Sequence, residues 1–103
     1  MARVAWAVTA LNDVREITRY LSEFSRSAAE EFQAKVKRAA TLLETTPKMG
    51  RIVPDFGIEC FREVILRPYR LMYIVNEEDC EIVALVDGRR DLRNLIRPAD
   101  YGL

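Results

Sequence analysis

The feature that most constrains the fold is a change in the spacing of apolar residues partway along the chain. Through residues 10–43 the apolar side chains recur at intervals of three and four, which is the spacing of amphipathic helices. After residue 60 they occur instead in three short runs rich in β-branched and aromatic residues, which indicates strands. Such a chain must bury one side of its helices against one face of a sheet.

Two helices are expected in the first half of the chain. The first helix is predicted to follow a short strand at residues 4–8, with Thr9 as its N-cap. The helical pattern breaks at Ser25, and Ser27 with Glu30 fits a capping box that would begin the second helix. Because the link between the two helices is short, they are predicted to form a helical hairpin.

Three strands are expected in the second half. A loop at residues 47–59 contains two prolines and two glycines, and it precedes strands predicted at residues 61–66, 69–75 and 80–86. The segments between these strands are short and turn-like, which predicts antiparallel neighbours. Residues 91–97 are predicted to make one or two helical turns before a proline.

The predicted element order is therefore β-α-α-β-β-β. The economical arrangement is an α+β fold in which the helical hairpin packs on one face of an antiparallel sheet. A chain of 103 residues is expected to form a single domain spanning residues 1–103. The opposite face of the sheet is expected to be left for solvent or a partner.

The first predicted hairpin fixes the positions of two arginines. If Leu66 pairs with Tyr69, alternation of side chains puts Arg62 on one face of the sheet and Arg70 on the other. On that second face, Glu63 is a diagonal neighbour with which Arg70 can form an ion pair.

Charge and composition narrow the possible functions. Sixteen basic residues balance sixteen acidic ones, and this neutrality weighs against a protein whose affinity rests on neutralising phosphates. The chain has no histidine, so the usual general base is missing. It has no apolar stretch long enough to span a membrane and no cleavable leader pattern, so a cytoplasmic protein is expected.

A cluster of arginines follows the last predicted strand, in the stretch VALVDGRRDLRNLIRP at residues 83–98. Placing Arg89 and Arg90 together at a strand end favours a role in binding an anionic or carboxylate partner. The alternative is a local salt bridge from these arginines to Asp87 or Asp91.

The chain resembles the RelE/ParE superfamily of toxins from type II toxin–antitoxin modules. The resemblance rests on the order and spacing of several segments, among them ALNDVREITRYL, AAEEFQAKV, LLETTPKMGRIVPD and IVALVDGRRDL. It implies the β-α-α-β-β-β fold, no metal or organic cofactor, and a cognate antitoxin whose C-terminal segment wraps the toxin. Leu11, Tyr20 and Leu42, at the margins of the helical stripes, are the candidate antitoxin contacts.

The superfamily contains two branches with different targets. ParE-like members inhibit DNA gyrase, whereas RelE-like members are mRNA interferases that act on the ribosome. Neutral charge and the missing histidine favour the ParE-like branch, as does DGRRDL, which resembles the ParE-type ending H-x-R-x-D-L with Asp87 in place of the histidine. The prediction is therefore a gyrase inhibitor acting by protein–protein contact rather than catalysis. Its candidate target-binding residues are Arg51, Arg89, Arg90 and Asp91.

The alternative is a RelE-like, ribosome-dependent endoribonuclease. In that case several basic residues would converge on the scissile phosphate, and a tyrosine would carry the proton. These candidate catalytic residues are Arg51, Arg62, Arg70, Arg89 and Tyr101. Arginine stabilises charge but is a poor base, so the pKa of Tyr101 would have to be lowered by the neighbouring cations.

Overall fold

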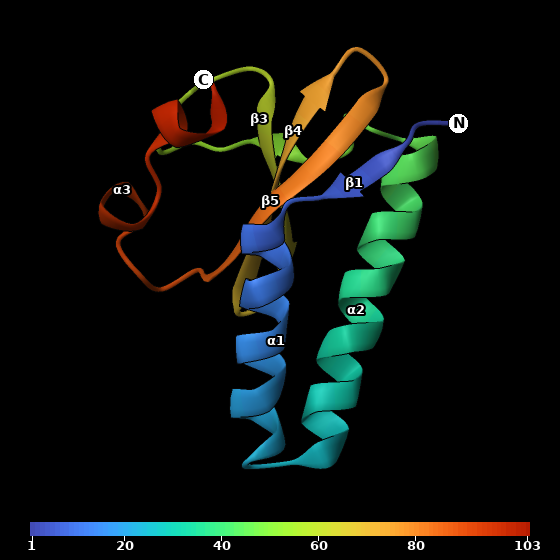
Figure 1. The fold of residues 1–103 in the computed structure, drawn as a ribbon, viewed down its shortest axis with the longest axis vertical. Coiled ribbons are helices and arrows are strands. Elements are labelled where there is room, and N and C mark those ends of the chain that lie inside the picture. Colours follow the sequence, from blue (N-terminus) through green and yellow to red (C-terminus); the bar gives the residue numbers. More distant parts are fainter.

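The computed structural model describes residues 1–103 and confirms the predicted fold class (Figure 1). The elements are β1 (Val4–Trp6), α1 (Val8–Ser22), α2 (Arg26–Thr45), β2 (Arg51–Ile52), β3 (Phe61–Leu66), β4 (Tyr69–Asn76), β5 (Asp79–Asp87), α3 (Leu92–Leu95) and a 3-10 turn at Pro98–Tyr101. No helix combines the length and the apolar character needed to cross a membrane.

The sheet has five strands in the order β1-β5-β4-β3-β2. Strands β3 to β5 are antiparallel neighbours, as predicted for the meander, and β2 adds to β3 in the same antiparallel sense. Strand β1 runs parallel to β5 and makes that edge of the sheet mixed. Strand β2 lies inside the predicted loop at residues 47–59. It was missed because two residues are too few to show a period.

The predicted register of the β3–β4 hairpin is confirmed. Leu66 stands opposite Tyr69, and Ile65 stands opposite Arg70. Side-chain alternation therefore places Arg62 on the face covered by the helices, while Glu63 and Arg70 share the opposite face.

Both predicted N-caps are wrong by two residues. Helix α1 begins at Val8, so Thr9 lies inside the helix, where its hydroxyl donates to the carbonyl oxygen of Val83 on β5 (2.8 Å). Helix α2 begins directly after Ser25, and the hydroxyl of Ser25, not that of Ser27, accepts a hydrogen bond from the backbone N–H three residues later (3.2 Å). The cap of α2 thus coincides with the break in the helical pattern.

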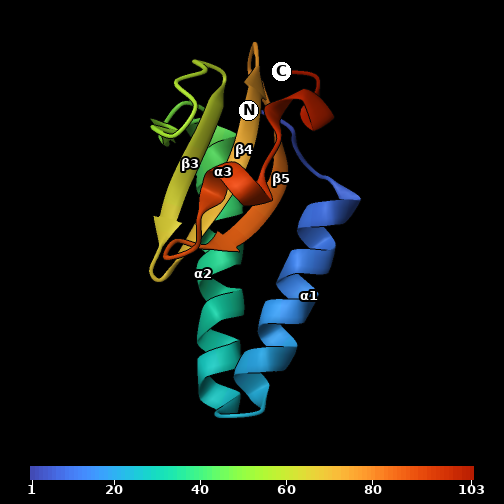
Figure 2. The ribbon, with the colours of Figure 1, turned by 90° about the vertical axis from the view of Figure 1, so that its left-hand side faces the viewer.

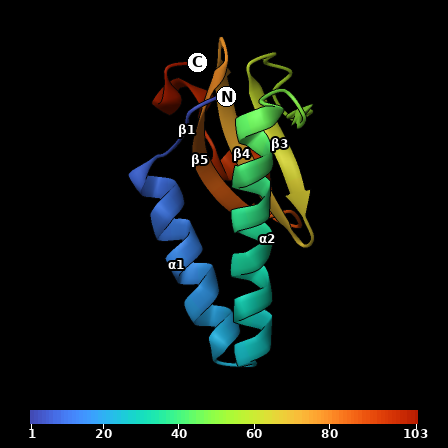
Figure 3. The same cartoon turned by 90° about the vertical axis from the view of Figure 1, so that its right-hand side faces the viewer.

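The α1–α2 hairpin covers one face of the sheet, and the turn between its helices projects beyond the sheet (Figures 1 and 3). Phe32 and Leu43 of α2 are buried in one cluster with Leu71 and Tyr73 of β4. This cluster is the larger of two apolar cores, and it fixes the helical layer against the sheet.

The opposite face of the sheet is not wholly free, which corrects the expectation from the sequence. The C-terminal segment, residues 92–103, lies across it (Figure 2). Leu92 and Ile96 of this segment are buried with Phe61, Met72 and Val83 of the sheet. What remains open on this face includes a hollow beside the β3–β4 turn.

Gly50 lies where the chain passes closest to β3 and β4. Its N–H donates to the hydroxyl of Tyr73 (2.9 Å), and a Cβ at this position would lie 2.6 Å from the carbonyl oxygen of Glu63. Gly50→Ala is therefore expected to lower the free energy of unfolding by about 2 kcal/mol, because a buried methyl group must be forced against backbone. Urea denaturation followed by the fluorescence of the single tryptophan, Trp6, measures this loss.

The matched control is Gly57→Ala. A methyl group added at Gly57 would meet nothing within 4 Å, but the φ of +66° at this position disfavours alanine. That strain alone is expected to lower stability by about 1 kcal/mol. Equal or smaller losses at Gly50 than at Gly57 would contradict the steric argument.

Candidate functional site

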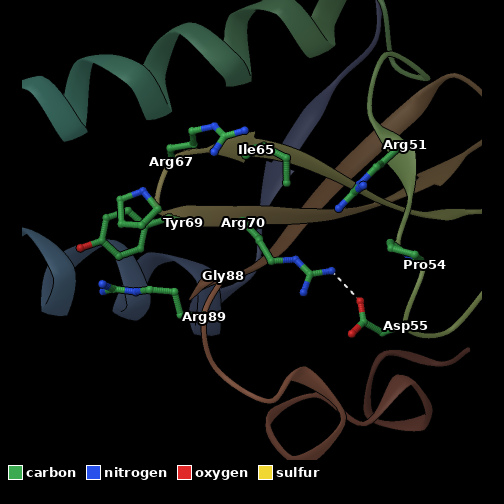
Figure 4. A pocket seen from close by; sticks show the side chains of 10 residues that line it. Arg51, Pro54, Asp55, Ile65, Arg67, Tyr69, Arg70, Gly88 and Arg89 are labelled. Atoms are coloured by element: carbon green, nitrogen blue, oxygen red, sulfur yellow. Dashed lines mark hydrogen bonds and ion pairs between the residues drawn. The ribbon is translucent and has the colours of Figure 1, made fainter.

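A hollow of about 710 Å³ opens beside the β3–β4 turn, on the face of the sheet opposite the helical hairpin (Figure 4). Its residues come from β2 and the following loop, from the β3–β4 hairpin and from the start of the segment after β5. They are Arg51, Pro54, Asp55, Ile65, Arg67, Pro68, Tyr69, Arg70, Gly88 and Arg89. We call this site the arginine hollow.

The arginine hollow brings together three of the candidate arginines, Arg51, Arg70 and Arg89. It does not include Arg62, which lies on the other face of the sheet and donates from Nη1 to the carbonyl oxygen of Gly50 (2.9 Å). The predicted convergence of four arginines is therefore corrected to three, joined by Arg67, which sequence reasoning did not single out.

Tyr101 does not reach the arginine hollow either. It lines a separate groove between α1, β5 and the C-terminal segment, and its ring lies 6.2 Å from that of Phe61, centroid to centroid. Burial raises the pKa of Tyr101, and the nearby carboxylates of Asp13 and Asp100 raise it further. This is opposite to the lowered pKa that a proton carrier would need.

An ion network centred on the buried Glu63 links Arg51 and Arg70, two of the residues that line the arginine hollow. The side chain of Glu63 is 0% exposed, and it accepts hydrogen bonds from Nε of Arg51 (2.7 Å) and Nε of Arg70 (2.6 Å). Arg70 also donates from Nη2 to Asp55 (2.6 Å), the interaction drawn in Figure 4. The predicted Arg70–Glu63 pair is confirmed, and Arg51 from β2 and Asp55 from the following loop extend it.

Arg70 and Asp55 stabilise each other's charged forms. Burial alone would lower the pKa of the Arg70 guanidinium, but its hydrogen bonds to Glu63 and Asp55 outweigh burial and raise it. The hydrogen bond from Arg70 holds the pKa of the Asp55 carboxyl below its ordinary value, against a smaller effect of burial. Both groups therefore stay charged across the physiological pH range.

Arg89 forms the local salt bridge that the sequence offered as its alternative role. Its Nε and Nη2 donate to the two carboxylate oxygens of Asp87 at 2.9 and 2.6 Å, and its backbone N–H donates to the same carboxylate. These hydrogen bonds lower the pKa of Asp87 to about 2, and those from the Arg89 side chain have the largest effect. The Arg89 side chain remains 78% exposed at the rim of the hollow.

The other two candidate target-binding residues lie just outside the hollow. Asp91 caps α3, where its carboxylate accepts from the backbone N–H of Arg93 (3.2 Å) and from the side chain of Asn94 (2.8 Å). Arg90 is exposed and lines the groove that also contains Tyr101. The helix cap is a structural role for Asp91 that the DGRRDL pattern alone did not reveal.

The arginine hollow is better suited to binding an anion than to acid–base catalysis. The tyrosine of the hollow, Tyr69, is buried. Burial raises the pKa of Tyr69, and the negative charge of Asp87 raises it further. Its carboxylate, Asp55, has a lowered pKa, which makes it a weak base. Guanidinium groups bind carboxylates and phosphates but do not accept protons at neutral pH.

The candidate antitoxin contacts lie on the helical layer. Leu11, Tyr20 and Leu42 are 39%, 58% and 48% exposed, respectively. Leu11 lines an apolar groove of about 370 Å³ between α1, α2 and β1, which also contains Trp6. Tyr20 lies near the α1–α2 turn with its ring 5.1 Å from that of Phe24, and Leu42 lies outside the groove.

The chain is similar to known toxins in sequence and in fold. Residues 4–92 match the family described as ParE toxin of type II toxin-antitoxin system, parDE. A protein named Toxin RelE2, from Caulobacter vibrioides, is 34% identical over 91 residues, which cover 87% of this chain and 99% of that protein. A solved structure described as Chromosomal ParDE TA system from P. aeruginosa has the same fold, with a TM-score of 0.66 at 17% identity over 84% of this chain and 96% of that one.

Proposed function

The chain belongs to the ParE family of toxins from type II toxin–antitoxin systems, and we propose that it acts by inhibiting DNA gyrase through protein–protein contact. The observation that carries this proposal is that most arginines of the hollow already form ion pairs within the chain. Three of the four, Arg51, Arg70 and Arg89, are already paired with carboxylates of the chain itself.

A nuclease centre needs uncompensated positive charge for the phosphate and a group that can move a proton. Here Asp55, Glu63 and Asp87 offset most of the charge of the four arginines. The tyrosine expected to carry the proton lies in another groove. A surface of paired, solvent-facing arginines instead suits contact with a protein, where guanidinium groups are frequent anchors.

The proposed target-binding surface is centred on Arg51 and Arg89, two of the exposed arginines of the hollow. The side chains of Arg51 and Arg89 are 61% and 78% exposed and approach the hollow from opposite sides (Figure 4). Arg90 and Asp91 follow directly in the chain and extend this surface toward α3. The residues come from separate segments, so the surface exists only in the folded chain.

The antitoxin is proposed to bind the helical layer. The apolar groove between α1, α2 and β1 presents Trp6, Leu11 and Val14 to solvent, and its rim carries Lys37 and Glu44. An apolar segment of the antitoxin would bury these side chains, and the exposed Tyr20 and Leu42 would extend the contact along the hairpin.

A supercoiling assay tests the gyrase proposal. The purified toxin is expected to stop supercoiling by gyrase at near-stoichiometric ratios and to leave message intact in a translating extract. Arg51→Ala and Arg89→Ala are each expected to raise the toxin concentration needed by about tenfold, as interface arginines commonly do. Arg38→Ala removes an exposed arginine of α2 that lies outside the hollow, and it serves as the matched control.

The second candidate is a ribosome-dependent mRNA interferase. It is favoured by the gathering of Arg51, Arg70 and Arg89 in one hollow and by the relative named Toxin RelE2. Message cleaved in the translating extract, with supercoiling unaffected at stoichiometric excess, would establish this function and overturn the gyrase proposal. Arg89→Ala would then abolish cleavage.

A further inference from the structure

We propose that the arginine hollow is a docking groove for an acidic, extended segment of the target protein, and that Asp87 competes with this segment for Arg89. The inference rests on the proposed function, since it describes how the toxin recognises its protein target. It goes further by stating the chemistry of the segment that binds and by naming Asp87 as a competitor within the toxin, which lowers the affinity for that segment.

Three arginines of the hollow already hold carboxylates of the chain itself. Carboxylates of the chain accept from the guanidinium groups of Arg51, Arg70 and Arg89 at 2.6 to 2.9 Å. Arg51 commits only Nε to its partner, so its Nη donors stay available on a side chain that is 61% exposed. Arg67 is exposed and has no ion pair, so it offers a complete guanidinium fork.

The walls between the arginines are apolar. Ile65, which is 43% exposed, lies in the hollow with Pro54 (Figure 4). Pro68 also lines it. Apolar walls between cations match a peptide in which acidic and apolar side chains alternate. They provide no hydrogen-bond donors for the successive phosphates of a nucleic-acid backbone. Because Arg51 and Arg89 lie at opposite sides of the hollow, a segment that reaches both must be extended.

The ion pairs in the hollow differ in how easily an incoming carboxylate can replace them. Glu63 is 0% exposed and Arg70 only 11%, so an incoming carboxylate cannot readily reach this pair. The Asp87–Arg89 pair lies at the surface, with side chains 24% and 78% exposed. Exposed ion pairs contribute little to stability, so a carboxylate of the partner can replace Asp87 at small cost.

Fluorescence anisotropy with a labelled, glutamate- and leucine-rich peptide tests this inference. The toxin is expected to bind this peptide and not its glutamine counterpart. Arg89→Gln is expected to weaken binding by about tenfold, and Asp87→Asn to tighten it by about threefold because Arg89 is released. The double variant should bind as weakly as Arg89→Gln alone, and Arg38→Gln, outside the hollow, should bind as the wild type does.

Three results would overturn the inference: no binding of the glutamate-rich peptide, unchanged or weakened binding by Asp87→Asn, or tighter binding of a uridine oligonucleotide than of the peptide. The last would identify the hollow as a nucleic-acid site. Because this assay contains no gyrase, failed peptide binding with supercoiling still inhibited overturns only the docking groove. The expected pattern with unaffected supercoiling supports the groove and overturns the gyrase proposal.

Discussion

Glu63→Gln is expected to lower the free energy of unfolding by about 3 kcal/mol, because it takes the shared carboxylate from the largely buried guanidinium of Arg70 and from the exposed guanidinium of Arg51. The Glu63 side chain is 0% exposed and accepts from both Arg51 and Arg70. Glutamine keeps one acceptor oxygen but points an NH₂ group at donors, which creates an unsatisfied contact. The remaining pair between Arg70 and Asp55 keeps the loss near the lower end of the range for buried pairs.

Urea denaturation of Glu63→Gln should be compared with Glu81→Gln, which removes an exposed carboxylate of β5 that has no ion pair. The control is expected to change stability by less than about 0.5 kcal/mol. In the double variant Glu63→Leu with Arg70→Leu, much of the loss should be recovered, since both buried charges are gone. A loss at Glu63 no larger than at Glu81 would show that the network does not stabilise the fold.

The register of the β3–β4 hairpin could be predicted because only Arg67 and Pro68 separate the two strands. A separator this short leaves one register, and the register then decides which side chains share a face. The same rule already placed Arg62 and Arg70 on opposite faces. The prediction that four arginines converge conflicted with that placement. In the structure Arg62 and Arg70 lie on opposite faces of the sheet, as the register requires.

The rest of the site depends on contacts that periodicity does not encode. Arg51, on β2, and Asp55, in the loop after it, reach the hollow because Gly50 brings the chain close to β3 and Tyr73. The pair of Arg89 with Asp87 was foreseen as an alternative because the two residues are neighbours in sequence. That this pair lies on the rim of a hollow could be seen only in the folded structure, because the other residues of the hollow come from distant parts of the sequence.

The burial of the C-terminal segment was the main structural feature missed. Helical turns were predicted at residues 91–97, and α3 occupies Leu92–Leu95. A helix of four residues is too short for its apolar positions to define a buried face. The sequence therefore did not indicate that Leu92 would close a second core on the sheet.

Leu92→Ala measures how strongly this segment is held. Leu92 is 2% exposed and buried in a cluster with Phe61, Met72, Val83 and Ile96. Truncation is expected to lower the free energy of unfolding by about 3 kcal/mol, because it removes buried apolar surface and leaves a cavity that the short segment cannot fill. The fluorescence of Trp6 in a urea titration reports the loss.

The matched control on the same helix is Leu95→Ala, since Leu95 is 37% exposed and lies outside that cluster. It is expected to lower stability by less than about 1 kcal/mol, in proportion to its smaller buried area. Leu92 directly follows the GRRD turn, so loosening it should also weaken the proposed inhibition of gyrase, whereas Leu95→Ala should not. Equal stability losses at the two leucines would mean that the C-terminal segment lies on the sheet without forming part of its core.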